Sequence, residues 1–232
     1  MPLPPADRSG SAEKPEGTGR RGRRGDPAAK REALLEAALT VFLAEGYSAA
    51  RLDDIAAAAG VAKGTIYLQF KDKEDLFRAL ILERMAPLLT EAEALAGNFT
   101  GTTRELLKML SQRMRQELLA TRRKDLLRLV ISEAPRFPWL AEFHYRNVVS
   151  RGVGMVRMIA KRGVERGELA SDALVRFPQL LPPSMLTAVI WTTVFNRFEP
   201  LDADAFIDTH LELLLRALET PAASARPERS GT

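Results

Sequence analysis

Cysteine is absent from the 232 residues of this chain, which excludes disulfide bonds and thiolate zinc sites. The two histidines, His144 and His210, lie in different predicted helices and have no thiols to join them as metal ligands. We therefore expect neither a metal nor a cofactor. No apolar run reaches the roughly 18 residues that a membrane-spanning helix needs, and the first residues lack the apolar stretch of a secretory signal. These absences favour a cytoplasmic protein without a membrane partner.

Sequence patterns typical of enzymes are also missing. Serines are few, and none sits in a nucleophile-elbow pattern. The glycines of "RGVGMVR" lack the strand–turn–helix context of a nucleotide-binding loop. We predict no catalytic residues, although an enzyme hidden in a helical bundle stays open as an alternative.

A mild excess of positive charge points to an anionic partner. The net charge is +4 and the isoelectric point is about 9.6. Residues 1–25 are rich in proline, glycine, serine and charge, so we predict a disordered basic arm, and the similar composition of residues 220–232 predicts a disordered tail. The arm carries a cluster of Arg20, Arg21, Arg23 and Arg24, which either contacts DNA or keeps the chain soluble.

Between these termini the apolar residues recur at helical spacing, and no alternating strand pattern appears. The sequence therefore predicts an all-α fold. Asp26-Pro27 has the composition of a helix start, and Gly46 that of a helix end. Two short helices over 52–59 and 63–70 follow.

Past Asp72, which caps a long helix ending near Gly97, the pattern predicts a larger helical bundle. Thr102 and Glu105 form a capping-box signature for the next helix. The segment 171–198 is apolar but contains three prolines, which exclude a single straight helix. Further helices are expected over 124–133, 139–167 and 204–219.

The stretch 52–70 has the pattern of a helix-turn-helix. Ile55, Ala59 and Ile66 are small or apolar at spacings that let two helices cross tightly, and Gly60 occupies the turn. The second helix of such a pair is held by packing, so its outward side chains are free to enter the major groove of DNA.

The same residues carry a family resemblance. The stretch "LDDIAAAAGVAKGTIYLQFKDKEDLF" resembles the helix-turn-helix signature of the tetracycline-repressor (TetR/AcrR) family, over about residues 28–80. The resemblance implies an all-α homodimer with a three-helix DNA-binding head and a C-terminal bundle for effector binding and dimerisation. We accordingly expect a head over 26–71 and a bundle over 72–219. Two departures from the family pattern, Ala50 and Ala62, remove capping hydroxyls that are each worth about 1 kcal/mol.

Chemistry suggests how the head contacts DNA. Lys63 and Thr65 lie near the start of the second short helix, where a lysine can donate to guanine and a threonine methyl can touch thymine. Gly64 lets the backbone approach closely. We expect Tyr67, Lys71 and Arg51 to bind phosphates, and the arm arginines to enter a minor groove or raise affinity.

Each of these assignments has an alternative. Tyr67 could be a packing residue, and Lys71 could belong to a solvated face. For Lys73, three residues before Leu76, the solvated face is the preferred interpretation.

The C-terminal third holds more apolar residues than one buried face needs. We predict that two helices from each subunit form an intermolecular four-helix bundle, with the filling of one subunit's core as the alternative. Leu186, Ile190 and Val194 belong to this apolar stretch. The candidates for the dimer interface are Met185, Val189, Trp191, Phe195, Phe206, Leu211, Leu214 and Leu218.

Methionines and aromatic residues between positions 109 and 158 suit a roomy apolar pocket. No charged residue stands out as an anchor, so we expect a small apolar or amphipathic effector of open chemical class. The candidates are Met109, Met114, Phe137, Trp139, Phe143, His144, Met155 and Met158.

Together these patterns predict a homodimeric transcriptional regulator, a repressor in the simplest case, that binds a palindromic operator in double-stranded DNA. An effector would favour a dimer whose recognition helices miss successive major grooves, about 34 Å apart. Alternatively, the C-terminal bundle holds a protein partner instead of a small molecule.

Overall fold

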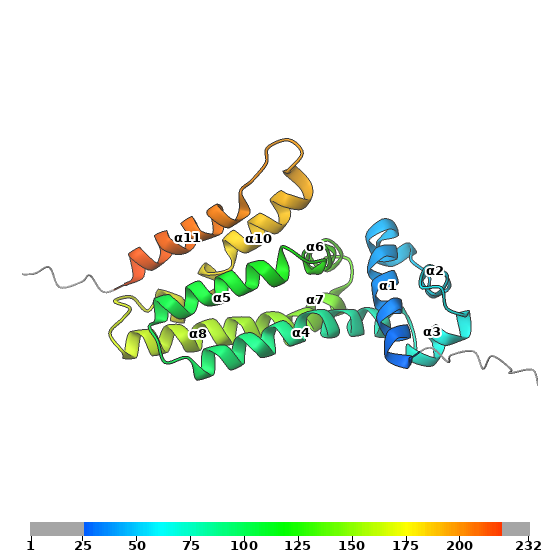
Figure 1. Cartoon of the computed structure of the whole chain (residues 1–232), viewed down its shortest axis with the longest axis horizontal. Helices are drawn as coiled ribbons and strands as arrows, with labels where there is room; N and C mark the ends of the chain where they lie inside the picture. Colours follow the sequence, from blue (N-terminus) through cyan, green and yellow to red (C-terminus); the bar gives the residue numbers. More distant parts are fainter. Residues whose placement is uncertain (1–25, 220–232) are drawn as a thin grey trace, which may run out of the picture.

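The computed structural model describes residues 26–219, and the regular structure in this range is helical (Figure 1). Three helices form the head: α1 (Pro27–Ala49), α2 (Leu52–Ala58) and α3 (Lys63–Gln69). The cap at the start of α1 is present, since a carboxylate oxygen of Asp26 accepts a hydrogen bond from the amide of Ala28 at 3.0 Å. The all-α prediction is confirmed for the described residues.

Gly46 interrupts α1 where the sequence predicts a helix end. Its φ of +78° lies in the left-handed region that glycine adopts most easily. A Cβ at this position would also lie 3.2 Å from a carboxylate oxygen of Glu133, so that side chain would have to shift slightly, while the positive φ strains any other residue. The chain then turns from α1 towards α2.

The remaining helices build the bundle. The long helix α4 (Lys73–Asn98) leaves the head and lies beside α5 (Thr103–Leu118) and α8 (Ser150–Glu165) (Figure 1). α6 (Arg123–Glu133) and α7 (Pro138–His144) lie at the end nearest the head. A π-helical turn over Tyr145–Val149 joins α7 to α8, so the single helix predicted over 139–167 is divided.

The predicted interruption between 171 and 198 is confirmed. A short helix α9 (Ala173–Arg176) and a 3₁₀ turn over Pro178–Leu180 precede α10 (Pro183–Ile190). A second π-helical turn over Trp191–Phe195 follows α10, and α11 (Ala203–Leu218) returns beside it. Helices α10 and α11 form a layer over α5 (Figure 1).

Local chemistry explains where the long helices begin. A carboxylate oxygen of Asp72 accepts a hydrogen bond from the amide of Asp75 at 2.8 Å. At α5, the Thr102 hydroxyl accepts from the amide of Glu105 at 3.2 Å, and the Glu105 carboxylate accepts from the amide of Thr102 at 2.9 Å. Both predicted capping signatures are therefore confirmed.

Two buried clusters divide the apolar core. One crosses from the head into the bundle and includes Phe42 and Ile55 with Leu129 and Leu140 of α6 and α7. The other lies at the far end, between α4, α5, α8 and α11. Because the first cluster is shared, the boundary between head and bundle at residue 72 stays a prediction.

Aromatic rings form the centre of the shared cluster. The ring centroids of Phe42 and Phe77 are 5.0 Å apart, and those of Tyr47 and Phe137 are 4.8 Å apart. Trp139 lies 5.6 Å from Tyr47. Burial raises the pKa of Tyr47 to about 12, so this phenol stays neutral. These contacts join α1 and the start of α4 to the α6–α7 region.

Helix α4 contains Pro87 in its interior. Proline has no amide hydrogen, so the carbonyl of Glu83 cannot receive the usual helical bond from residue 87. One residue further, the carbonyl of Arg84 accepts a hydrogen bond from Nε of Arg123 on α6 at 2.7 Å. Helix α4 continues through Pro87, but it lacks the backbone hydrogen bond to the carbonyl of Glu83 in the turn that lies next to α6.

Among the residues that the structure describes, no helix combines the length and apolar character needed to cross a membrane.

Candidate functional site

The packing of the head determines which side of α3 faces outward. Ile55 of α2 and Ile66 of α3 are fully buried, and Phe70 closes the same side just after α3. Gly60, with φ of +66°, makes the turn between the two helices. The opposite side of α3 presents Gly64 and Leu68, which lie one helical turn apart.

Asp53 of α2 holds two of the predicted DNA-contacting side chains. Nζ of Lys63 donates to one of its carboxylate oxygens at 2.7 Å, and the Tyr67 hydroxyl donates to the other at 3.1 Å. The hydrogen bond from Lys63 lowers the pKa of Asp53, and Asp53 in turn raises the pKa of Lys63. Asp53 therefore orients both donors on the exposed surface and opposes part of the lysine charge.

The other predicted DNA contacts lie around this pair. Arg51, Gly64 and Lys71 are exposed, whereas Thr65 is half-buried. A Cβ at position 64 would meet nothing within 4 Å, so the surface is open there. The backbone amide of Lys71 donates to the Asp75 carboxylate at 3.0 Å, which fixes the chain just after α3.

The interpretation of Lys73 as a residue of a solvated face is wrong. Its Nζ donates to the carbonyls of Ser48 and Ala50, at 2.8 and 3.0 Å, and lies 4.7 Å from the centroid of the Tyr47 ring. Partial burial lowers its pKa. Lys73 therefore caps the end of α1 and fastens α4 to it, a role that sequence spacing did not indicate.

The basic arm, with Arg20, Arg21, Arg23 and Arg24, lies outside the described residues, so its proposed DNA contact stays a prediction. Ala62 occupies the N-cap of α3 as predicted, and that cap makes no side-chain hydrogen bond. The N-cap of α2 is Arg51, so the prediction that Ala50 stands at a capping position of α2 is wrong; Ala50 instead follows the last residue of α1. Asp53 and Asp54 lie in the first turn of α2, where negative charge is favourable.

Leu68 is a surface residue that the sequence analysis did not single out. It is 88% exposed, the highest value among the large apolar side chains in the described part of the chain. The signal that could have revealed it is its spacing, since it lies four residues after Gly64 and two after the buried Ile66.

Four of the effector candidates lie where the head meets the bundle. Phe137, Trp139 and Phe143 pack against the shared core cluster. The guanidinium of Arg78 lies 4.7 Å from the centroid of the Phe143 ring. His144 follows Phe143 in the chain and is buried. Its Nδ1 has no hydrogen-bond partner among the described residues.

The methionine candidates lie elsewhere. Met155 packs against the far core cluster, Met114 is half-buried, and Met109 and Met158 are exposed. The eight candidates are therefore distributed over the junction, the far core and the surface. Their role in effector binding stays a prediction.

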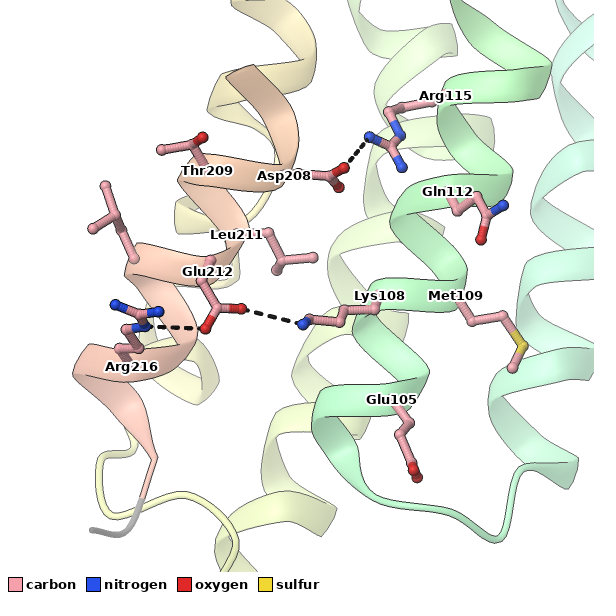
Figure 2. A pocket seen from close by; sticks show the side chains of 11 residues that line it. Glu105, Lys108, Met109, Gln112, Arg115, Asp208, Thr209, Leu211, Glu212 and Arg216 are labelled. Carbon is pink, nitrogen blue, oxygen red and sulfur yellow. Dashed lines mark hydrogen bonds and ion pairs between the residues drawn. The ribbon is translucent and has the colours of Figure 1, made fainter. Parts of the chain in front are cut away.

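Met109 lines a surface groove of about 910 Å³ between α5 and α11 (Figure 2). Charged side chains reach across this groove. Lys108 pairs with Glu212 at 3.2 Å, and Arg115 pairs with Asp208 at 2.9 Å (Figure 2). These ion pairs link α5 to α11 across the groove. The charged side chains that line it at these points are therefore already paired with each other.

His144 gives the bundle a pH-dependent stability. Burial lowers its pKa from 6.5 to about 4, so the folded state keeps the ring neutral while the unfolded chain takes up a proton below pH 6.5. Stability therefore falls as the pH drops from 6.5 towards 4. We expect the unfolding free energy to fall between pH 7 and pH 5 by roughly 2 kcal/mol more in the parent than in His144→Gln.

Urea unfolding at both pH values and one fixed protein concentration measures this difference. A parallel His210→Gln variant serves as control, because that histidine is only half-buried. Equal pH sensitivity of His144→Gln and the parent would contradict the prediction.

The predicted dimer residues fall into two groups. Val189, Leu211 and Leu218 are buried within their own subunit, which matches the alternative in which they fill one core. Met185 and Leu214 are partly buried against the two clusters. Trp191 and Phe206 are half-buried and Phe195 is exposed.

A different apolar surface is open to solvent. Leu186, Ile190 and Val194 recur at helical spacing along α10 and the π turn after it, and each is exposed. Phe198 and Leu213 of the neighbouring segments are exposed as well. The dimer contact stays a prediction. This surface, here called the α10 stripe (Leu186, Ile190 and Val194), is a run of exposed apolar side chains along one helix of the bundle.

Comparison with known proteins gives two family matches. A model described as bacterial regulatory proteins of the tetR family matches residues 34–80, and one described as the tetracyclin repressor-like C-terminal domain matches residues 99–218. The fatty acid metabolism regulator protein of Bacillus subtilis is 27% identical over 186 residues, which cover 80% of this chain and 93% of that protein. The transcriptional repressor BepR of Brucella suis is 46% identical over 56 residues, 24% of this chain and 27% of that one. Among solved structures, the fatty acid degradation regulator FadR from Bacillus halodurans matches with a TM-score of 0.63 at 27% identity, over 80% of this chain and 94% of that chain.

Proposed function

Because the chain belongs to the TetR family of bacterial regulatory proteins, we propose that it acts as a homodimeric repressor that leaves a palindromic operator when a small effector binds. Members of this family are DNA-binding transcriptional regulators, and this chain is one of them and not an enzyme. The proposal adds three features to family membership: the chain forms a homodimer, it represses transcription, and a small effector releases it from DNA.

The observation that carries the proposal is the outward face of α3. Ile66 and Phe70 hold the helix against the head, so Lys63, Gly64 and Tyr67 stand on an exposed surface. Cations suit the phosphate backbone, and an exposed α-helix fits the major groove. Lys63 contacts base edges in this proposal, while Tyr67, Lys71 and Arg51 contact phosphates. Asp53 holds Lys63 and Tyr67 in position before DNA arrives.

The α10 stripe supports a homodimer. Its three exposed apolar residues lie on one side of a helix whose other side is buried in the subunit. Two copies of this surface, related by a two-fold axis, would cover each other. A packed bundle with an exposed apolar surface also suits a different protein partner, and a second copy of this chain is the partner that we propose.

The effector is proposed to be a small apolar or amphipathic molecule. Support comes from the name of the Bacillus subtilis relative, which places that protein in fatty acid metabolism. Effector binding would shift the dimer towards a form whose two α3 helices no longer match successive major grooves. Helix α4 connects the head to the bundle and would carry this motion.

Selection of bound fragments from the source genome tests the proposal. The purified chain is mixed with sheared genomic DNA in dilute salt, and the retained fragments are sequenced. We expect a shared two-fold symmetric motif with half-sites about 34 Å apart or a related distance. The absence of enriched fragments at low salt would reject DNA binding through this face. Titration of the complex with fatty acids and acyl-CoAs then tests release.

Lys71→Ala should flatten the salt dependence of operator binding. If each lysine neutralises one phosphate, the dimer loses two such contacts, and the slope of log affinity against log salt falls by about 2 in magnitude. The loss of affinity should be similar for operator and unrelated DNA, because a phosphate contact carries no sequence information. Fluorescence anisotropy over a range of salt concentrations measures both quantities.

Lys161→Ala provides the matched control. Lys161 is an exposed lysine of α8 that lies 3.7 Å from Glu165, on a helix of the bundle. Its removal changes the net charge equally and should leave the slope unchanged. An unaltered slope for Lys71→Ala rejects the phosphate role of Lys71.

A further inference from the structure

Folding of the subunit buries almost none of the apolar surface of Leu68. It is 88% exposed, while Ile66 and Phe70 on the other side of the same segment are buried. No contact within the head explains a leucine at this place. Because isolated exposed leucines are common on protein surfaces, exposure alone does not assign a role, and the surroundings of the side chain decide.

The surroundings of Leu68 fit a duplex. Gly64 lies one turn earlier on the same side of α3, and a Cβ there would meet nothing within 4 Å. The backbone can therefore approach a partner closely at position 64, which brings the longer Leu68 side chain against that partner. Lys63 and Tyr67 stand beside this stripe, and Arg51 and Lys71 are exposed around it. Leu68 is thus an apolar residue surrounded by hydrogen-bond donors and cationic side chains. This arrangement fits a DNA groove, because phosphates line the edges of the groove and bases form its floor.

The floor of the major groove offers one kind of apolar group, the C5-methyl of thymine. We propose that Leu68 reads a thymine methyl at one position of each operator half-site. The inference rests on the proposed function, since it requires α3 to enter the major groove. Thr65, whose methyl group was expected from the sequence to touch a thymine, is half-buried and lies off the outermost stripe. Leu68 is therefore the specificity residue at that base pair.

Deoxyuridine substitution tests this contact directly. Uracil differs from thymine only by the missing methyl group, so hydrogen-bonding groups and phosphates stay unchanged. Each thymine of the selected operator is replaced in turn, in both half-sites. For the parent protein we expect one position at which the change lowers affinity about 4-fold per half-site, which corresponds to one buried methyl group.

The variant Leu68→Ala completes a double-mutant cycle. We expect it to bind thymine and uracil operators equally at that position. Thr65→Ser, which removes the threonine methyl, should keep the penalty for uracil, and so should Leu82→Ala, a control on the partly exposed side of α4. Circular dichroism melts verify that each variant is folded.

The outcomes separate this inference from the proposed function. Retention of the uracil penalty in Leu68→Ala, or its loss in Thr65→Ser, overturns the assignment to Leu68. A parent protein that binds the operator without any uracil penalty also overturns it, while the proposed function stands. A parent protein that binds no duplex removes both.

Discussion

Replacement of Gly64 by glutamate lowers operator affinity at least about 100-fold and leaves the protein as stable as the parent or more stable. Gly64 lies in the first turn of α3, and a side chain there meets nothing within 4 Å. Glutamate exceeds glycine in helix propensity by roughly 0.5–1 kcal/mol, and the positive end of the helix dipole favours its charge. The fold therefore tolerates the substitution.

DNA binding does not tolerate it. In the proposed complex the new carboxylate stands on the outermost stripe of α3, where it meets phosphate charge and holds the backbone away from the groove. Base contacts of about 1–3 kcal/mol each are lost in both half-sites, which accounts for the expected factor. Anisotropy titration gives the affinity, and a thermal melt gives the stability.

Gly154→Glu is the matched control. Gly154 is an exposed glycine of α8, and a side chain there also meets nothing within 4 Å. The same change of charge and size in the bundle should leave operator affinity unaltered. Unchanged affinity in Gly64→Glu would place the DNA-binding face elsewhere than on α3.

Replacement of Ile190 by aspartate should convert the proposed homodimer to a monomer and, through that change, lower operator affinity at least about 100-fold. Ile190 is 39% exposed in the centre of the α10 stripe. A two-fold interface would bury the new charge twice without a partner, at several kcal/mol for each ion. A monomer holds a single half-site, so the binding energy of the second one is lost.

Sedimentation at micromolar concentration and anisotropy measure the two effects. Ile131→Asp is the matched control, because Ile131 is 45% exposed on α6, outside the stripe. It should remain dimeric and bind DNA normally. A dimer that survives both Ile190→Asp and Leu186→Asp would show that the subunits associate through another surface.

Local chemistry accounts for the parts of the fold that the sequence predicted well. A capping side chain acts on amides two or three residues away, so Asp26, Asp72 and Thr102 identify helix starts without knowledge of the tertiary structure. The same holds for glycine at Gly46 and Gly60, where a positive φ reflects a local requirement. The outward position of Lys63 and Tyr67 followed from the short apolar pattern of α3.

Longer-range contacts explain what the sequence analysis missed. Asp53 meets Lys63 only because α2 crosses α3, and Lys73 meets carbonyls of residues 48 and 50 only because α4 starts against the end of α1. On α10 and α11, apolar residues occupy both sides, so periodicity could not tell the buried Val189 from the exposed Ile190. Neighbouring helices decide such cases.

Pro87 has a mechanical consequence for how the molecule can bend. The shared core cluster includes α4 as far as Met85, and the far cluster begins at Ala92. The interrupted turn therefore lies between the parts of α4 that pack in the two core clusters. We expect α4 to bend more easily at this turn than elsewhere, and α5, which contributes Leu118 to the shared cluster and Leu106 to the far one, to limit how far the head can tilt.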